Sequence, residues 1–252
     1  MAPILKEEWE ISVMREAGRI AAGAMELMEG MVRPGISTRE IDAAVERFIR
    51  SAGAIPTFKG YRGFPASVCA SINEEVVHGI PSGRRLNEGD IISLDVAATY
   101  KNYVGDMAKT FPVGRISGEA RELVDVTRNV LHEAINVVGP GVSLSKISST
   151  IQNYVESRGF SVVKKYVGHG IGTTMHEDPQ VPNFVADPIE NYEFQLKPGL
   201  VIAIEPMVNA GTDDVKALKD GWAVVTRDGR LSAHFEHTIA VTKTGREVLT
   251  LP

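Results

Sequence analysis

The segment LNEGDIISLD, residues 86–95, recurs later in the chain as LKPGLVIAIE, residues 196–205. Each copy begins with a glycine turn, continues as an apolar run typical of a β-strand, and ends on a carboxylate, Asp95 in the first and Glu205 in the second. An ionised carboxylate in a buried strand is unfavourable unless another charge pairs with it. Two such acids at matching positions therefore indicate a shared cation.

The similarity between the two parts of the chain extends upstream of these strands. Helical patterns open at Arg15 and at Arg121, and each leads to a Pro-Gly pair, at residues 34–35 and 140–141. A second amphipathic helix follows in each part. Two helix pairs can resemble each other through composition alone, but here both parts predict the same order of helix, helix, loop, strand and strand.

Duplication predicts one domain over residues 1–252, with pseudo-repeats at about 11–115 and 116–250. The first repeat carries a clear boundary signal, because Ser37 followed by Glu40 forms a capping box at the start of its second helix. The halves would pack about a pseudo-two-fold axis. Equivalent strand positions would then face each other across a central groove, where ligand sites tend to form.

The composition narrows the classes of partner. A net charge of −5 without any run of Lys or Arg gives no electrostatic basis for binding nucleic acid or an anionic membrane. The single cysteine, Cys69, excludes an intramolecular disulfide and fits a reducing compartment. We find no secretory signal and no apolar run of membrane-spanning length, so we expect a cytoplasmic location.

Each of the two acids has a second carboxylate in its own half. After Asp95 the strand continues to a turn expected at residues 100–102, and the returning strand would bring Asp106 alongside Asp95. In the second half, Glu236 lies inside a late β-type run, much as Asp106 lies inside its strand. Neighbouring carboxylates repel each other unless they share a proton or a cation.

A nitrogen ligand is available in the segment GHGIG, residues 168–172, because the glycines beside His169 allow a close approach to a site. Four carboxylates and one imidazole are too anionic for one divalent ion but suit two ions with bridging carboxylates. This ligand set favours Co(II), Mn(II), Fe(II) or Zn(II) over Ca(II) or Mg(II). Two adjacent ions can activate a bridging water and polarise a carbonyl or phosphoryl oxygen.

Two further histidines stand next to turns, His78 in VVHGIP and His176 in TTMHEDP. A histidine in a loop is usually a surface residue or a satisfied core residue. If these two line the groove, they can donate hydrogen bonds to developing charge or relay protons.

Together these residues resemble those of the type I methionine aminopeptidases, which are M24 peptidases. The resemblance runs from about residue 11 to residue 248 and rests on three motifs in a fixed order: NEEVVHGIP at residues 73–81, GHGIG at residues 168–172 and IEPM at residues 204–207. It implies an α+β protein with the pita-bread fold, in which outer helices cover a central antiparallel sheet made of two pseudo-symmetric halves.

The resemblance also implies the activity and its setting. A monomeric cytoplasmic hydrolase would remove the initiator methionine from nascent polypeptides, at the ribosome, when the second residue is small. The first helix starts almost at once, and only 28 residues separate His176 from Glu205. We therefore expect the short bacterial form, without an N-terminal extension or a helical insertion.

Residue roles carry over from the family to the matching positions. The resemblance implies that Asp95 chelates one metal ion, that His169 and Glu205 hold the other, and that Asp106 and Glu236 bridge the two ions. A bridging water or hydroxide would attack the carbonyl carbon after methionine. Glu205 would help to move its proton.

The resemblance assigns substrate contacts as well. His176 would hydrogen-bond the substrate carbonyl and the oxyanion, and His78 would contact the amide nitrogen on the leaving side. Apolar residues at the matching positions would form the methionine pocket, as a thioether side chain requires. These are Phe58, Tyr61, Phe64, Met175 and Trp222. Some bacterial members have Cys, Tyr or Phe where this chain has Phe58, Phe64 and Met175, which bears on pocket width and not on the reaction class.

Three other functions use parts of the same pattern. A prolidase or aminopeptidase P shares the fold, but usually carries a large additional N-terminal domain. A binding protein on this fold should have lost metal ligands and gained basic surface, whereas this chain keeps the ligands and is acidic. A two-metal phosphatase would need Arg or Lys among the motif residues to hold a phosphate.

Overall fold

The computed structural model describes residues 3–185 and 194–252. The helices are α1 (Glu8–Met31), α2 (Thr38–Ser51), α3 (Gly118–Asn136) and α4 (Leu144–Glu156), with a short 3-10 turn at Tyr61–Gly63. The strands are β1 (Ile55–Pro56), β2 (Val68–Ile72), β3 (Glu75–Val77), β4 (Ile91–Tyr100), β5 (Tyr103–Pro112), β6 (Ser161–Val162), β7 (Gly168–Gly170), β8 (Glu177–Val181), β9 (Val201–Ile204), β10 (Met207–Asn209), β11 (Val215–Ala217), β12 (Val224–Thr226), β13 (Ser232–His234), β14 (Glu236–Val241) and β15 (Arg246–Val248).

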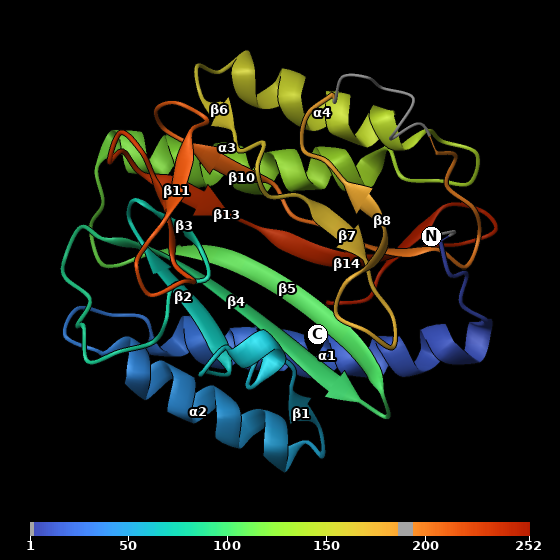
Figure 1. Cartoon of the computed structure of the whole chain (residues 1–252), viewed down its shortest axis with the longest axis horizontal. Helices are drawn as coiled ribbons and strands as arrows, with labels where there is room; N and C mark the ends of the chain where they lie inside the picture. The colour runs from blue at the N-terminus through green and yellow to red at the C-terminus, as the bar shows by residue number, and fades with distance from the viewer. Residues whose placement is uncertain (1–2, 186–193) are drawn as a thin grey trace.

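A nine-stranded antiparallel sheet forms the centre of the molecule, in the order β1-β4-β5-β14-β9-β7-β8, with β2 beside β4 and β15 beside β14. Strands of the first half meet those of the second half where β5 pairs with β14. In Figure 1, α1 and α2 lie along the first-half strands, and α3 and α4 lie along the second-half strands. The predicted α+β pita-bread architecture, with outer helices and two pseudo-symmetric halves, is confirmed.

The β4–β5 hairpin forms as the sequence predicts. Its turn residues Lys101 and Asn102 have φ values of 45° and 69°, which suits a tight turn whose twist matches the sheet. Side chains alternate between the faces of β4, so Leu94 and Val96 enter the apolar core while Asp95 points to the other face. The carboxylate therefore leaves the core without interrupting the strand.

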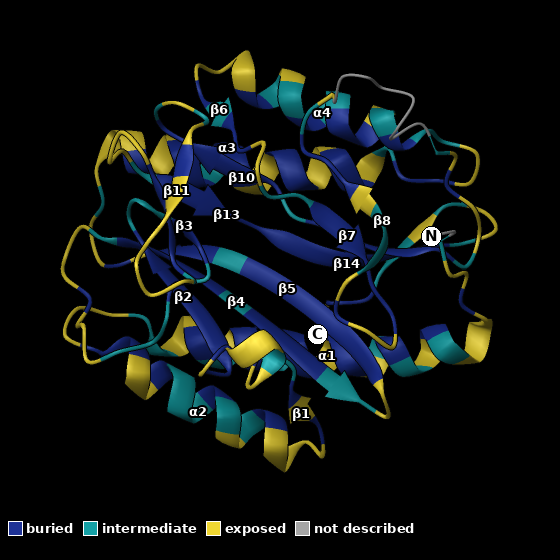
Figure 2. Ribbon diagram, in the orientation of Figure 1, coloured by how far each residue is buried: buried dark blue, intermediate teal, exposed yellow. Residues whose placement is uncertain are grey.

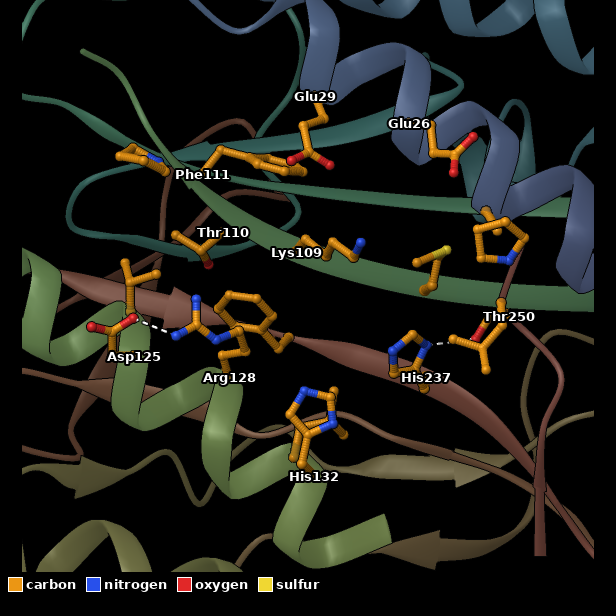
Figure 3. A pocket seen from close by; sticks show the side chains of 18 of the residues that line it. Glu26, Glu29, Lys109, Thr110, Phe111, Asp125, Arg128, His132, His237 and Thr250 are labelled. Atoms are coloured by element: carbon orange, nitrogen blue, oxygen red, sulfur yellow. Dashed lines mark hydrogen bonds and ion pairs between the residues drawn. The ribbon is translucent and has the colours of Figure 1, made fainter.

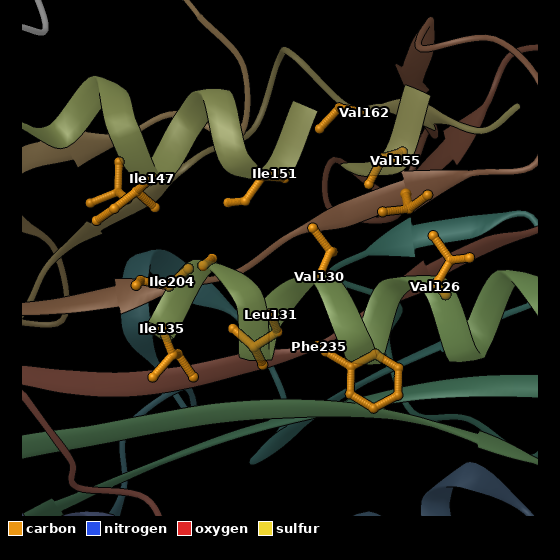
Figure 4. Close-up of a cluster of buried hydrophobic side chains, with 14 of the residues drawn as sticks. Val126, Val130, Leu131, Ile135, Ile147, Ile151, Val155, Val162, Ile204 and Phe235 are labelled. Carbon is orange, nitrogen blue, oxygen red and sulfur yellow. The ribbon is translucent and has the colours of Figure 1, made fainter. Parts of the chain in front are cut away.

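Each half has its own apolar core on the helix side of the sheet. In the second half, Ile147 and Ile151 of α4 and Val130 and Leu131 of α3 belong to one buried cluster (Figure 4). Burying one such side chain contributes about 1.5–3 kcal/mol. Figure 2 shows the sheet buried and the outward faces of the helices exposed, so the helices shield the sheet from solvent on that side.

Helix boundaries follow capping chemistry. The Ser37 hydroxyl accepts from the Glu40 backbone N–H and the Glu40 carboxylate accepts from the Ser37 N–H, which confirms the predicted capping box. Helix α1 starts about two turns earlier than the pattern at Arg15 predicted, because the Glu10 carboxylate accepts from the Glu7 N–H at 2.7 Å and caps the helix there. No helix in the described ranges combines the length and apolar character needed to cross a membrane.

Candidate metal centre and active site

The strand register places three carboxylates around one small residue. Ala108 on β5 pairs with Asp95 on one side and with Glu236 on the other. Asp106 lies two positions along β5 and therefore points to the same face of the sheet. Its direct partner is Ala97, so the two aspartates are diagonal neighbours. The short alanine side chains leave the space above them to the acids.

The second half supplies the opposing wall in the same way. Ala203 on β9 pairs with His169 on β7 and with Thr238 on β14. Glu205 follows Ala203 by two positions and shares its face. The Thr238 hydroxyl accepts from the Asp106 N–H at 3.0 Å and donates to the Asp106 carbonyl oxygen at 2.8 Å. This double contact fixes the two halves against each other at the carboxylates.

The imidazole of His169 is oriented by its own strand. Its Nδ1 lies 2.9 Å from the carbonyl oxygen of Gly170, so Nδ1 carries the proton and donates to that oxygen. Nε2 is then available as a ligand atom. It lies 3.5 Å from Oε1 of Glu205 and 3.9 Å from Oδ2 of Asp106. Asp106, His169 and Glu236 each offer a ligand atom within 4.8 Å of the other two.

Three of the acids at this site each have one carboxylate oxygen without a hydrogen-bond partner within the protein. Oδ1 of Asp95, Oδ1 of Asp106 and Oε1 of Glu236 are buried and accept no hydrogen bond. Burial raises the pKa of Asp95 to about 7. Burial, then the negative charges of Glu236 and Asp95, raise the pKa of Asp106. Burial lowers the pKa of His169 to about 3 and keeps its imidazole neutral. Unpaired oxygen acceptors that converge with a neutral imidazole fit divalent transition-metal ions.

These groups line one side of a cavity of about 280 Å³. Every residue for which the sequence predicted a site role lies in its wall. The predicted residues are Phe58, Tyr61, Phe64, His78, Asp95, Asp106, His169, Met175, His176, Glu205, Trp222 and Glu236. The structure thus brings together side chains from both halves of the chain in one place.

The two predicted substrate-binding histidines lie near the ligand set. His176 stands beside His169 with 4.3 Å between ring centroids, and its Nδ1 lies 2.7 Å from the hydroxyl of Tyr61. Burial, then the guanidinium of Arg62, lower the pKa of His176. His78 has a φ of 62°, a strained backbone that often marks a functional position, and burial lowers its pKa to about 4. Both imidazoles are therefore neutral at pH 7.

Aromatic side chains form the apolar part of the cavity. Phe64 meets Phe58 and Trp222 edge to face, with centroid distances of 6.4 Å and 5.1 Å. Trp222 in turn meets His78 edge to face at 6.4 Å. Met175 packs in the same apolar cluster. An unbranched apolar side chain held by these residues would place its backbone beside the carboxylates.

The sequence did not single out every residue of this site. His234 is buried, and its Nε2 has no hydrogen-bond partner and lies 3.7 Å from Oε2 of Glu205. Its position two residues before Glu236 is the signal that could have drawn attention to it. Cys69 is opposite Asp95 in the β2–β4 ladder, and burial raises the pKa of its thiol. The cavity wall also contains Arg62 and Tyr166.

A second hollow, of about 520 Å³, lies on the opposite face of the sheet between α1 and α3 (Figure 3). Glu26 and Glu29 line it from α1, Arg128 and His132 from α3, and Lys109 from β5. Within residues 3–185 and 194–252, no three metal-ligating side chains converge there. The smaller cavity over the carboxylates is therefore the candidate active site.

The fold and this ligand set define a metal-dependent hydrolase with the pita-bread fold.

Comparison with known proteins identifies the family. The sequence model of metallopeptidase family M24 matches residues 12–243. Methionine aminopeptidase 1 of Bacillus subtilis is 54% identical over 247 residues, which is 98% of each chain. Crystal structures of methionine aminopeptidases from Thermotoga maritima and Rickettsia prowazekii both align with a TM-score of 0.96. The first is 42% identical and covers 100% of both chains, and the second is 39% identical and covers 99% of this chain and 100% of that one. The chain belongs to metallopeptidase family M24.

Proposed function

We propose that this protein is a methionyl aminopeptidase that removes the initiator methionine from nascent polypeptides whose second residue is small. The observation that carries this proposal is the juxtaposition, in one cavity, of an apolar aromatic pocket with four carboxylates and an imidazole. The relatives in family M24 bear the name methionine aminopeptidase.

The ligand set supports two divalent ions per chain, drawn from Co(II), Mn(II), Fe(II) and Zn(II). Asp95 would hold one ion, His169 and Glu205 the other, and Asp106 and Glu236 would bridge. The buried acceptors of Asp95, Asp106 and Glu236 that lack partners fit these roles. When bound, such ions supply a nucleophilic water at neutral pH and polarise the scissile carbonyl.

Three side chains would accept a proton or form hydrogen bonds with the substrate. Burial raises the pKa of Glu205, so its carboxylate can accept the proton of the nucleophile near neutral pH. With the Tyr61 hydroxyl donating to Nδ1, His176 carries its proton on Nε2 and can donate it to the carbonyl oxygen and then the oxyanion. His78 would contact the nitrogen of the leaving amide.

The setting of the enzyme forms part of the proposal. We infer a single domain over residues 1–252, with pseudo-repeats at about 11–115 and 116–250, that acts as a monomer in the cytoplasm. Its substrates would be the N-termini of nascent chains emerging from the ribosome. Neither a nucleic acid nor a membrane is expected as a partner, since the net charge of −5 offers no attraction to either anionic surface.

A peptide panel tests the proposed reaction. Chelator-treated protein would receive Co(II), Mn(II), Fe(II) or Zn(II) and then Met-Ala-Ser, Met-Lys-Ser, Leu-Ala-Ser or Met-Pro-containing peptides. Metal-dependent release of methionine from Met-Ala-Ser, with little release from Met-Lys-Ser or Leu-Ala-Ser, is expected. Cleavage that depends on proline rather than on methionine would instead assign the chain to the prolidase type of activity.

Substitution of His78 by alanine is expected to lower kcat about tenfold and to leave metal binding unchanged. A neutral hydrogen bond contributes about 0.5–1.5 kcal/mol, which corresponds to a factor of this size. Steady-state kinetics and the metal content after desalting would measure the two effects separately. Loss of bound metal would mean that His78 is a ligand rather than a substrate contact.

A further inference from the structure

A buried ion pair lies directly behind the loop that carries His176. Nζ of Lys6 lies 2.6 Å from Oε2 of Glu177, and the two side chains are only 2% and 5% exposed. Lysine is rarely buried to this degree unless its charge is paired. Nζ also donates to the carbonyl oxygen of Ile4 at 3.0 Å. Two internal acceptors therefore hold the ammonium group, and one of them belongs to Glu177, the residue that follows His176.

The segment around Lys6 occupies a slot that two glycines keep open. A side chain at Gly172 would meet Oε1 of Glu177 at 2.4 Å and Cε of Lys6 at 2.6 Å, and one at Gly199 would meet the carbonyl oxygen of Lys6 at 2.7 Å. The Lys6 N–H donates to the carbonyl oxygen of Gly199 at 2.7 Å. Gly199 belongs to the turn before β9, the strand that leads to Glu205. The segment around Lys6 thus contacts both the loop of residues 172–176, here called the histidine loop, and the turn before β9, the strand that leads to Glu205.

The histidine loop has little regular structure of its own. Residues 172–176 form bends between β7 and β8. The loop is held to the sheet where the Val104 N–H donates to the Gly172 carbonyl oxygen at 2.9 Å. At its other end, the Glu177 carboxylate binds Lys6, and the loop's Thr174 N–H donates to that carboxylate at 3.4 Å. The Thr174 hydroxyl also donates to the His176 carbonyl oxygen at 3.2 Å. Glu177 therefore anchors both its neighbour His176 and Thr174 to the buried Lys6.

We propose that Lys6 is a positioning residue for the active site, which acts through its buried ion pair with Glu177 to hold His176 and Met175 in the cavity. This inference rests on the proposed aminopeptidase function, because both of those residues have assigned roles in substrate binding. The Tyr61 hydroxyl fixes the His176 ring at 2.7 Å from the cavity side, and the ion pair fixes its backbone from behind. Catalysis is sensitive to such placement, since a shift of about 1 Å can lower a rate about 100-fold.

Four variants test the pair: Lys6→Met, Glu177→Gln, the double variant Lys6→Met/Glu177→Gln, and Lys6→Arg. Each single neutral variant should lower kcat for Met-Ala-Ser about 10- to 100-fold, with a smaller change in KM and unchanged metal content. The double variant leaves no unpaired charge buried and should fold. Its kcat should be no lower than that of the single variants, because all three break the same contact. Lys6→Arg keeps the charge and should recover part of the rate.

Arg15→Met is the matched control. Arg15 in α1 pairs with Glu247 at 2.5 Å, at a partly exposed position, and lines neither the histidine loop nor the cavity. This variant should keep the parental kcat. Hydrogen exchange adds a readout that does not depend on turnover: in metal-free Lys6→Met protein, amides of residues 172–177 should exchange faster while those of β4 and β5 keep their protection.

The outcomes separate this inference from the proposed function. The positioning role of Lys6 would be overturned if the double variant kept the parental kcat. It would also be overturned if the loss of kcat in the double variant equalled the product of the losses in the two single variants. Uniform acceleration of exchange throughout the protein would reduce the pair to a general contribution to stability. If the parent protein releases no methionine with any of the metals, the proposed function fails, and the exchange experiment still reports whether the pair holds the loop.

Discussion

Replacement of Asp106 by asparagine is expected to lower kcat/KM for a Met-Ala-Ser peptide by about 1,000-fold or more. Asp106 lies between the two halves of the site, with a ligand atom within 4.8 Å of those of His169 and Glu236. A carboxamide lacks the negative charge and the second anionic oxygen that a bridging role requires. The loss corresponds to the several kcal/mol that a bound metal ion contributes to catalysis. Steady-state kinetics and calorimetric titration with Mn(II) would measure it.

The same substitution is expected to stabilise the protein when no metal is bound. Burial and the charges of Glu236 and Asp95 raise the pKa of Asp106, so ionised Asp106 opposes folding at neutral pH in the metal-free form. A neutral side chain of the same shape removes that repulsion. In chelator at pH 7.5, the variant should melt at a higher temperature than the parent. Added Mn(II) should raise the melting temperature of the parent by more than that of the variant.

Asp42→Asn provides the control for both effects. The Asp42 carboxylate accepts from the backbone N–H groups of Ser67 and Val68 at 2.8 Å and 3.1 Å and does not line the cavity. The same chemical change there should leave metal affinity intact. Parental activity and metal affinity in Asp106→Asn would show that Asp106 does not bridge the ions.

Replacement of His176 by alanine is expected to lower kcat about 100- to 1,000-fold, the usual cost of removing one oxyanion donor. The ring lies 4.3 Å from the His169 ring and is held by the Tyr61 hydroxyl, so its Nε2 can serve the reacting carbonyl. The effect should fall mainly on kcat, because the bond strengthens as charge develops on the oxygen. Kinetics over a range of Met-Ala-Ser concentrations would separate kcat from KM.

His132→Ala is the matched control for this variant. His132 is exposed on α3 and lines the hollow on the opposite face of the sheet. Its loss should change neither the rate nor the metal content. If His176→Ala lost its metal instead, His176 would belong to the ligand set, and the assignment of His169 as the nitrogen ligand would need revision.

Much of the fold could be predicted because the relevant signals are local. The glycine turn and the apolar run before Asp95 and Glu205 locate β4 and β9, and the capping box at Ser37 fixes the start of α2. Within β4, side chains point to alternate faces, so a one-residue shift would place the acid in the core. These features depend on neighbouring residues, which a sequence displays directly.

The remaining features depend on pairing between distant segments. The sequence placed Asp106 alongside Asp95, whereas the register sets it opposite Ala97 and makes the aspartates diagonal neighbours. His234 and Lys6 carry no motif of their own. Their environments arise only when β13 approaches Glu205 and when the N-terminal segment enters the slot beside Glu177. The spacing of His234 from Glu236 hints at a shared strand face, but the contact with Glu205 and the pairing of Lys6 with Glu177 depend on distant segments.

The pairing of β5 with β14 has a consequence for the order in which the site is made. Translation delivers Asp95 and Asp106 well before His169, Glu205 and Glu236, so a growing chain presents two acids without their counterparts. The complete ligand set exists only once the last long strand has been inserted between β5 and β9. Metal binding by a chain under synthesis would therefore report when the final folding step occurs. A fluorescent chelator that competes for Mn(II) could follow that step in real time.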